Sequence, residues 1–250
     1  MDSETPKNKN EYLRQIEELS KLTGALAHEI KNPLSTIKIN LKLISEDLEG
    51  SDSGQPGKIG PQIDDRKFAR ALRKIAIVQK ETDRLEQILD GFLRYVGNTE
   101  LQLADFDINE LVGDMVDFYS PQAYNRSITV RHSLYKEPLV CKADAGMLKQ
   151  VLLNLFINAQ QAMSQGGELL IRTERQKKDA VIQISDTGSG IAPDKLPRIF
   201  DAYYSGRPQG TGLGLATVRK IVHAHNGTIA VTSELGKGTS FTIKLPLQTR

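Results

Sequence analysis

The run HEIKNPL at positions 28–34 sets an imidazole beside a carboxylate, a pair that can carry out nucleophilic chemistry. Unperturbed histidine is mostly neutral at pH 7, and a neutral imidazole is a competent nucleophile. The carboxylate of Glu29 could hold one ring N–H of His28 while the other ring nitrogen attacks phosphorus. The fourth residue after His28 is Asn32, so the H-E-x-x-H spacing of a zinc site is missing. On these residues alone, a surface histidine without a catalytic role stays open as the alternative.

Two asparagines in QVLLNLFINAQQAM (150–163) are spaced to act together. Asn154 and Asn158 are four residues apart, so both amides lie on one face of the helix that this segment predicts. Amide oxygens are hard ligands that suit Mg²⁺, an ion that usually keeps several waters and bridges phosphates. A pair of surface or capping asparagines would have the same spacing, and this second interpretation stays open.

Asp186 stands where a predicted strand runs into a turn, in ISDTGSGIAP (184–193). A carboxylate at a strand end can accept a hydrogen bond from the amino group of adenine. Gly188 and Gly190 permit tight backbone geometry and close approach of a ligand. The D-T-G triplet also occurs in aspartic proteases, which need two such carboxylates facing each other. A protease is therefore an alternative only if a second copy of the chain supplies the second carboxylate.

A further turn, GTGLGL at 210–215, precedes a predicted helix. Its glycines, Gly210, Gly212 and Gly214, lead into a helix N-terminus whose backbone amides can hold phosphate. A dinucleotide-binding fingerprint needs a sixth-position glycine, and Leu215 occupies that position. No G-K-[ST] follows, so the turn is not a P-loop either.

Two apolar stripes near the N-terminus predict the helices that carry His28. Leucines and isoleucines recur every three or four residues over 11–48, and a second such stripe covers 68–95. The Gly-, Ser- and Pro-rich segment 50–62 predicts a loop between them. One helical hairpin cannot cover both stripes, so we predict a homodimer whose two hairpins form a four-helix bundle. Residues 1–10 are expected to be a disordered lead, and the hairpin is expected to cover 11–97.

After Gly97 the pattern changes to short β-branched or alternating segments between amphipathic ones. Five segments predict strands: 127–134, 167–174, 180–186, 227–234 and 238–246. Three predict helices: 108–123, 145–163 and 212–226. The interleaving indicates an α/β sandwich over 98–250, a mixed sheet with helices on one face. The whole chain is therefore predicted to be α+β.

Bulk composition excludes several classes of protein. The net charge is +2, from 33 basic and 31 acidic side chains, so we expect no nucleic-acid partner. No apolar run reaches the roughly 20 residues that span a bilayer. The single cysteine, Cys141, cannot form an intrachain disulfide, which favours a reducing, cytoplasmic compartment. We predict that Cys141 is a small buried apolar residue.

In this order, the motifs resemble those of the histidine kinases. HEIKNPL resembles their H-box, and the three later segments resemble the N-box, G1-box and G2-box of the ATPase superfamily of gyrase, chaperones, histidine kinases and MutL, also called the GHKL or Bergerat fold. PRIFDAYYS (197–205) resembles the F-box, and GKGTSF (236–241) the terminal strand motif. The H-box separates this chain from the other branches of the superfamily.

The resemblance implies ATP-dependent phosphorylation of His28 and transfer of the phosphoryl group to a response-regulator aspartate, in a two-component system. It implies that Glu29 is the proton partner of His28 and that Asn32 orients water for dephosphorylation of the regulator. The resemblance implies that Asn158 binds Mg²⁺. The implied nucleotide contacts are Asn154, Asn158, Asp186, Gly188, Gly190, Gly210, Thr211, Gly212, Leu213, Gly214, Leu215 and Thr239.

Two departures from the family pattern bear on this reading. Gln161 replaces the Lys or Arg that many members carry three residues after the second N-box asparagine. The lid between F-box and G2-box is reduced to 205–209, so Arg207 is the candidate cation for the terminal phosphate. The alternative is that Arg207 is a solvated loop arginine without such a role. The rival from another class is a degenerate dimeric scaffold that binds nucleotide without transferring phosphate.

Overall fold

The computed structural model describes residues 6–49, 65–97, 100–206 and 210–248. The chain divides into two compact units between Arg94 and Tyr95. We predicted this boundary after residue 97. The loop predicted over 50–62 lies outside the described residues. None of the described helices is both long and apolar enough to cross a membrane.

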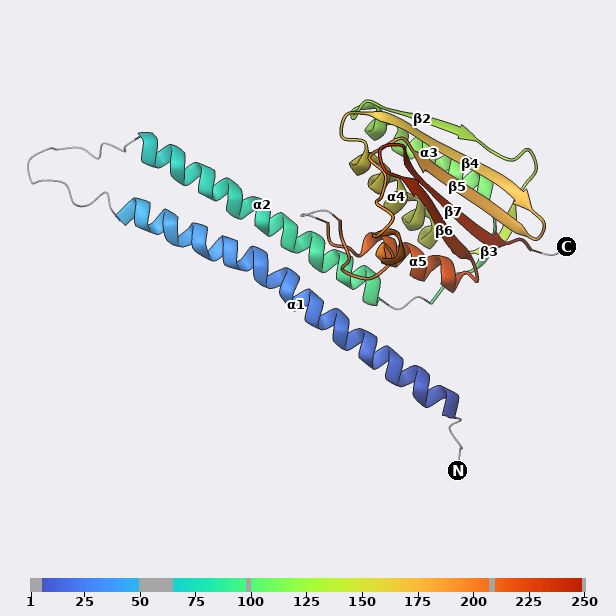
Figure 1. Cartoon of the computed structure of the whole chain (residues 1–250), viewed down its shortest axis with the longest axis horizontal. Helices are drawn as coiled ribbons and strands as arrows, with labels where there is room; N and C mark the ends of the chain where they lie inside the picture. Colours follow the sequence, from blue (N-terminus) through green and yellow to red (C-terminus); the bar gives the residue numbers. More distant parts are fainter. Residues whose placement is uncertain (1–5, 50–64, 98–99, 207–209, 249–250) are drawn as a thin grey trace, which may run out of the picture. The chain divides into compact units, whose positions relative to one another are not determined.

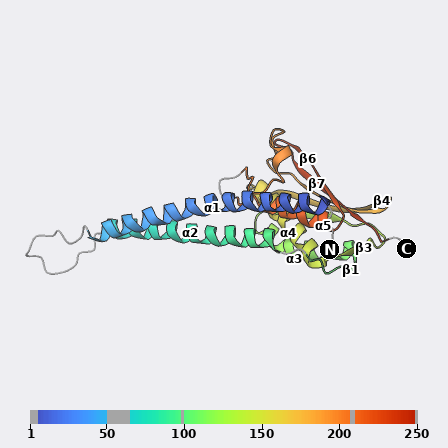
Figure 2. The same cartoon turned by 90° about the horizontal axis from the view of Figure 1, so that it is seen from below.

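The first unit is a hairpin of two long helices, α1 (Pro6–Glu49) and α2 (Asp65–Val96). They run side by side in two perpendicular views (Figures 1 and 2). The helix α1 begins five residues earlier than we expected, so residues 6–10 belong to it and not to a disordered lead. Proline is favoured in the first turn because its missing N–H would have no intrahelical partner there.

An ionic contact joins the two helices near the end of α1. The Lys74 ammonium donates to the Asp47 carboxylate at 2.6 Å and to the Leu43 carbonyl at 3.0 Å. This hydrogen bond from Lys74 lowers the pKa of Asp47 below its usual value. The same ammonium group thus ties the last turns of α1 to α2 through one side-chain and one backbone acceptor.

Many large apolar side chains of the hairpin are left uncovered. Ile88 is only 1% exposed, but the following side chains are between 39% and 59% exposed: Leu34, Ile39, Leu41, Leu43, Phe68, Leu72, Ile75, Ile77, Leu89 and Leu93. Large apolar side chains left exposed in such number on one hairpin normally mark an interface. The packing of one hairpin alone thus leaves the surface that the predicted four-helix bundle would bury.

The second unit carries a mixed sheet and a small antiparallel pair. Its elements are β1 (Ala104–Asp107), α3 (Ile108–Tyr124), β2 (Ile128–Ser133), β3 (Val140–Ala143), α4 (Ala145–Ala162), β4 (Gly167–Gln176), β5 (Asp179–Asp186), the 3₁₀ turn η1 (Leu196–Arg198), α5 (Gly214–Ala224), β6 (Thr228–Glu234) and β7 (Gly238–Pro246). The five-stranded sheet has the order β2-β4-β5-β7-β6, with β2 and β4 parallel and the other pairs antiparallel. The predicted mixed sheet is confirmed.

Helices α3, α4 and α5 cover one face of this sheet (Figure 1). The core lies between the layers, where Phe156 of α4 and Ile182 of β5 are at most 1% exposed. Alternate residues of the strands point to the other face, where Leu170 is 45% exposed. Cys141 is 1% exposed, as predicted, and burial raises the pKa of its thiol to about 12.

From its sequence context we predicted that His225, like His132 and His223, lies on the surface, but its side chain is 5% exposed. Its Nε2 accepts a hydrogen bond from the Asp144 N–H at 2.9 Å, so its Nδ1 carries the proton and donates to the Ile221 carbonyl at 2.8 Å. The neutral ring thus joins the end of α5 to the start of α4. Its partner lies 81 residues away in the chain, so local periodicity could not reveal the burial.

Candidate functional site

His28 lies on α1 two residues from the apolar positions Leu26 and Ile30, a spacing that predicts a solvent-facing ring, and its side chain is exposed. Asn32, one turn later, is exposed as well, whereas Glu29 is partly buried. Pro33 is buried, and α1 continues through it. The first unit therefore presents an imidazole and an amide to solvent, with a carboxylate one residue away.

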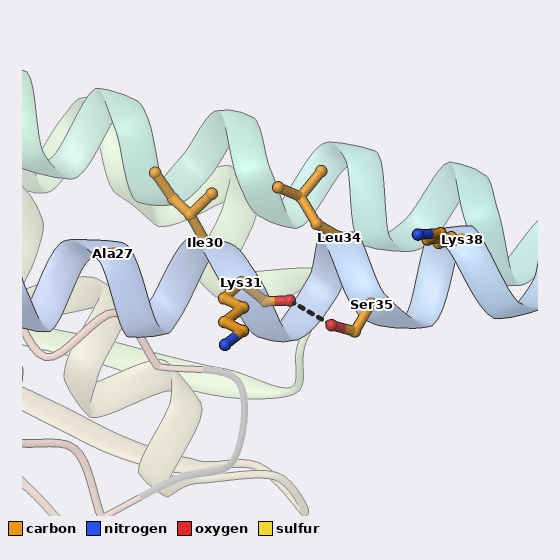
Figure 3. Close-up of a pocket in the computed structure, with 6 residues that line it drawn as sticks. All are labelled: Ala27, Ile30, Lys31, Leu34, Ser35 and Lys38. Atoms are coloured by element: carbon orange, nitrogen blue, oxygen red, sulfur yellow. Dashed lines mark hydrogen bonds between the residues drawn. The ribbon is translucent and has the colours of Figure 1, made fainter.

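A shallow groove of about 370 Å³ runs along α1 beside His28. Its lining comes from Ala27, Ile30, Lys31, Leu34, Ser35 and Lys38. Figure 3 shows Ile30 and Leu34 rising from the same side of the helix, while Lys31 extends away from them. The groove thus combines an apolar floor with two ammonium groups, that of Lys31 one turn from the candidate nucleophile and that of Lys38 nearly three turns from it.

The two N-box asparagines lie on α4 in the second unit. Leu155, Phe156 and Ala159 turn into the core, and Asn154 and Asn158 are partly buried beside them. The Asn154 amide donates to the Gly214 carbonyl at 3.4 Å, a contact 60 residues apart in sequence. The structure therefore brings the N-box next to the first residue of α5, where the glycine-rich turn ends.

Asp186 is the last residue of β5, and in the ladder it pairs with Thr239 of β7. Both side chains are buried, at 9% and 6% exposure. One carboxylate oxygen of Asp186 accepts the Gly188 N–H at 2.8 Å, which closes the turn. The Thr239 hydroxyl lies 2.9 Å from the Ser233 hydroxyl of β6. Two polar side chains thus lie at neighbouring strand ends in a largely apolar setting.

Two glycines hold these turns together by close backbone approach. At Gly190 φ is +69°, and an added Cβ would lie 2.1 Å from the Glu234 carbonyl oxygen. At Gly212 φ is +66°, and a Cβ would lie 2.5 Å from the Tyr203 carbonyl carbon. Only glycine fits either position without moving the neighbouring backbone. The G1 turn is therefore packed on β6, and the G2 turn on the segment that precedes it.

The G2 turn ends at the N-terminus of α5, which begins at Gly214. Leu213 is buried, Gly210, Thr211, Gly212 and Leu215 are partly buried, and the Leu213 N–H donates to the Thr211 hydroxyl at 3.4 Å. The first amides of a helix attract anions, so this end of α5 suits phosphate. Arg207, the candidate cation, lies outside the described residues.

The described residues fit the Mg²⁺ that the family pattern implies. Among them, no cluster of three or more His, Cys, Asp or Glu side chains could hold a metal ion. Asn158 lies on the partly exposed face of α4, one turn before Ala162, and the Ala162 carbonyl accepts the Ser189 N–H of the G1 turn at 3.1 Å. A single amide ligand suits an ion that takes its other ligands from water and phosphate.

Sequence reasoning missed residues that act across elements. Asp144 caps α4 by accepting the Met147 N–H at 3.0 Å and also accepts the Gln102 N–H at 2.9 Å. Arg84 of α2 lies 3.7 Å from the Glu29 carboxylate. An aspartate directly before a helical stripe is a signal that could have identified the cap. No local signal pairs Arg84 with Glu29, because they lie on different helices.

Two family descriptions match the chain. Residues 18–96 match the His Kinase A (phospho-acceptor) domain, and residues 143–249 match the histidine kinase-, DNA gyrase B-, and HSP90-like ATPase. The sensor histidine kinase ZraS of Escherichia coli K12 is 36% identical over 229 residues, covering 92% of this chain and 46% of ZraS. The chain thus spans about half the length of this curated relative.

Solved structures agree with the observed architecture. Full-length ShkA in complex with AMPPNP has a TM-score of 0.62 and 26% identity, covering 92% of this chain and 46% of that one. Histidine kinase ThkA in complex with the response regulator TrrA has a TM-score of 0.70, covering 99% of this chain and 68% of that one, and at 24% identity it supports the fold alone. The predicted fold, a helical hairpin followed by a GHKL-type ATP-binding domain, is confirmed. With both domains in order and a sensor kinase as a relative, the chain belongs to the histidine kinases and carries their phospho-acceptor domain and ATP-binding domain.

Proposed function

We propose that this chain transfers the γ-phosphoryl group of ATP to its own His28 and then to an aspartate of a response-regulator receiver domain. The observation that carries the proposal is the exposed His28, next to Glu29, in a chain whose second unit is an ATP-binding domain. An exposed imidazole can be reached by a nucleotide held elsewhere, whereas a buried one could not. A reducing, cytoplasmic setting belongs to the same proposal.

In the second unit, different residues would contact the adenine, the phosphates and the Mg²⁺ of the nucleotide. Asp186 and Thr239 would face adenine, since they lie together at the ends of β5 and β7. The amides at the start of α5 would hold phosphate oxygens, with Arg207 supplying a positive charge. Asn158 would hold Mg²⁺, which when bound neutralises charge on the phosphates.

The transfer step follows from the two ring nitrogens of His28. One nitrogen attacks the γ-phosphorus, the bond from phosphorus to the β–γ bridging oxygen breaks, and ADP leaves with the electron pair. The other nitrogen carries a proton, which the Glu29 carboxylate holds and accepts as positive charge develops on the ring. Glu29 thus acts as the proton partner, and Asn32 would position water for a phosphatase reaction on the regulator.

Two protein partners belong to the proposal. A second copy would cover the exposed apolar side chains of the hairpin, giving a homodimer. A receiver domain would dock beside His28, because its aspartate must reach the phosphorylated ring. The groove with Lys31 and Lys38 is adjacent to that ring and suits an acidic, partly apolar surface.

Incubation with ATP labelled in the γ-phosphate tests the proposal directly. We expect acid-labile, base-stable label on the wild-type chain and none on His28→Ala, with nucleotide binding retained in the variant. Normal labelling of His28→Ala would remove His28 from the mechanism. Nucleotide binding without label on the wild type would favour the scaffold, and peptide cleavage would favour the protease.

A further inference from the structure

A small ionic cluster joins α1 to α2 beside the candidate nucleophile. The Arg84 guanidinium lies 3.7 Å from Oε2 of Glu29 and 4.0 Å from Oε2 of Glu81, one turn earlier on α2. The Glu29 and Arg84 side chains are 30% and 27% exposed, and Glu81 is 18% exposed. One cation thus lies between two half-buried carboxylates, and one of these belongs to the residue that follows His28.

Stability alone gives a weak reason for this cluster. Partly exposed ion pairs contribute little to folding, because desolvation and side-chain ordering offset most of the attraction. The contact at 3.7 Å is an ion pair and is too long for a good hydrogen bond. Its main physical consequence is to restrict where the Glu29 carboxylate can lie.

A carboxylate has two oxygens, and the Glu29 oxygen that lies 3.7 Å from Arg84 is Oε2. We therefore assign Oε1 as the oxygen that accepts a ring N–H from His28. A catalytic carboxylate works best when a further group orients it, as in other nucleophile–base pairs.

We propose that Arg84 is a positioning residue for the phosphorylation of His28: it holds Glu29 through Oε2, so that Oε1 can receive the imidazole N–H. The proposal deepens the proposed function and rests on it. Arg84 touches neither the imidazole nor the nucleotide in this role. It acts through Glu29 alone, so its effect must vanish when Glu29 can no longer accept a proton.

The experiment compares autophosphorylation by the wild-type chain, Arg84→Met, Glu29→Gln and the double variant. General-base assistance is worth roughly 100- to 10,000-fold, so a misplaced base should lower kcat by about tenfold in Arg84→Met. The KM for ATP should not change, since nucleotide binding belongs to the other unit. In the Glu29→Gln background, Arg84→Met should have no further effect. Arg84→Lys, which keeps the charge, should recover part of the lost rate.

Two controls separate positioning from a structural role. Methionine is a good helix former, so Arg84→Met should retain the helix content of the wild-type chain. As a matched control, Arg73→Met removes the same charge from α2 three turns earlier and should leave kcat unchanged. Salt screens partly exposed pairs, so at saturating ATP the ratio of wild-type to Arg84→Met rates should fall as ionic strength rises. A role through the packing of the arginine side chain, and not through its charge, predicts a ratio independent of salt.

The outcomes are distinct. A higher kcat in Arg84→Met would mean that Arg84 withholds Glu29 from His28. An unchanged kcat, or losses that add to those of Glu29→Gln, would mean that Arg84 does not act through Glu29. Each of these results overturns the inference. Label that persists in His28→Ala would instead overturn the proposed function itself. Label lost in His28→Ala but unaffected in Arg84→Met rejects only the role of Arg84.

Discussion

Replacing Asp186 by asparagine exchanges one group of the nucleotide site and leaves its main internal contact in place. Oδ1 of Asp186 accepts the Gly188 N–H at 2.8 Å, and the side chain is 9% exposed. Asparagine keeps a carbonyl oxygen for that N–H but puts an amide NH₂ in place of the second carboxylate oxygen. The amino group of adenine, itself a donor, would then face another donor.

The size of the effect follows from the charge of the acceptor. A hydrogen bond to a charged group contributes about 1.5–3 kcal/mol, and each 1.4 kcal/mol is a factor of ten in affinity. We therefore expect Asp186→Asn to weaken ATP binding by roughly 10- to 150-fold. The kcat at saturating ATP should change little, because adenine is remote from the transferred phosphoryl group. Inosine triphosphate, which has a carbonyl oxygen in place of the amino group, should bind the variant better than ATP does.

Isothermal titration of ATP and inosine triphosphate into both proteins measures this reversal. Asp179→Asn, the same exchange at the opposite end of β5, is the matched control and should bind both nucleotides as the wild type does. The melting temperature of Asp186→Asn shows whether the turn at Gly188 is retained. If a folded Asp186→Asn kept wild-type affinity for ATP and the wild-type preference between the two nucleotides, the carboxylate would not recognise adenine.

Three further variants test the packing around the sites. Leu72→Glu puts a charge on the exposed apolar face of α2. Losing the burial of one leucine costs about 1.5–3 kcal/mol per protomer, so sedimentation equilibrium should show dimer association weakened at least tenfold, with a shift towards monomer. Asp144→Ala should lower the free energy of unfolding of the second unit by about 1 kcal/mol, the usual worth of an N-cap. Burial acts to raise the pKa of Asp144, but backbone hydrogen bonds, led by that from Met147, outweigh it and lower the pKa. The stability lost in Asp144→Ala should therefore be complete above about pH 4 and should shrink as the pH falls below that value. Chemical unfolding at several pH values measures this dependence. Gly190→Ala forces a Cβ to within 2.1 Å of the Glu234 carbonyl at a positive φ, so thermal unfolding should show a loss of about 1–2 kcal/mol, and titration a weaker affinity for ATP; an unchanged affinity would place the nucleotide away from this turn.

The long, strongly periodic elements could be predicted from sequence, and the contacts between them could not. The stripes of α1 and α2 follow from apolar spacing, and the five strands of the main sheet follow from alternation and β-branching. The strands β1 and β3 have only four residues each, too few for a period to show. The resemblance gave Thr239 as a nucleotide contact, but its pairing with Asp186 needed the register of β5 on β7.

Register also explains why the ionic partners were missed. A stripe shows which face of a helix is apolar, but not which turn of one helix lies opposite which turn of the next. The pairs Glu29–Arg84 and Asp47–Lys74 are set by that alignment. Similarly, the capped α4 and the ring of His225 meet only in the folded second unit. Sequence patterns therefore locate chemical groups well when the groups act alone, and poorly when one group orients another.

The separation of nucleophile and nucleotide into two units has a kinetic consequence. Asp186 acts on ATP binding in the second unit, whereas Arg84 acts on the position of the Glu29 carboxylate in the first. Changes at sites without shared partners add as free energies, so the KM effect of Asp186→Asn and the kcat effect of Arg84→Met should multiply independently in the double variant. The effects of changes at Arg84 and Glu29, which lie in one unit and contact each other, should not multiply independently. The pattern of additivity therefore distinguishes a carboxylate oriented by its own hairpin from one oriented by the arriving nucleotide domain, since the second case would couple Arg84 to Asp186.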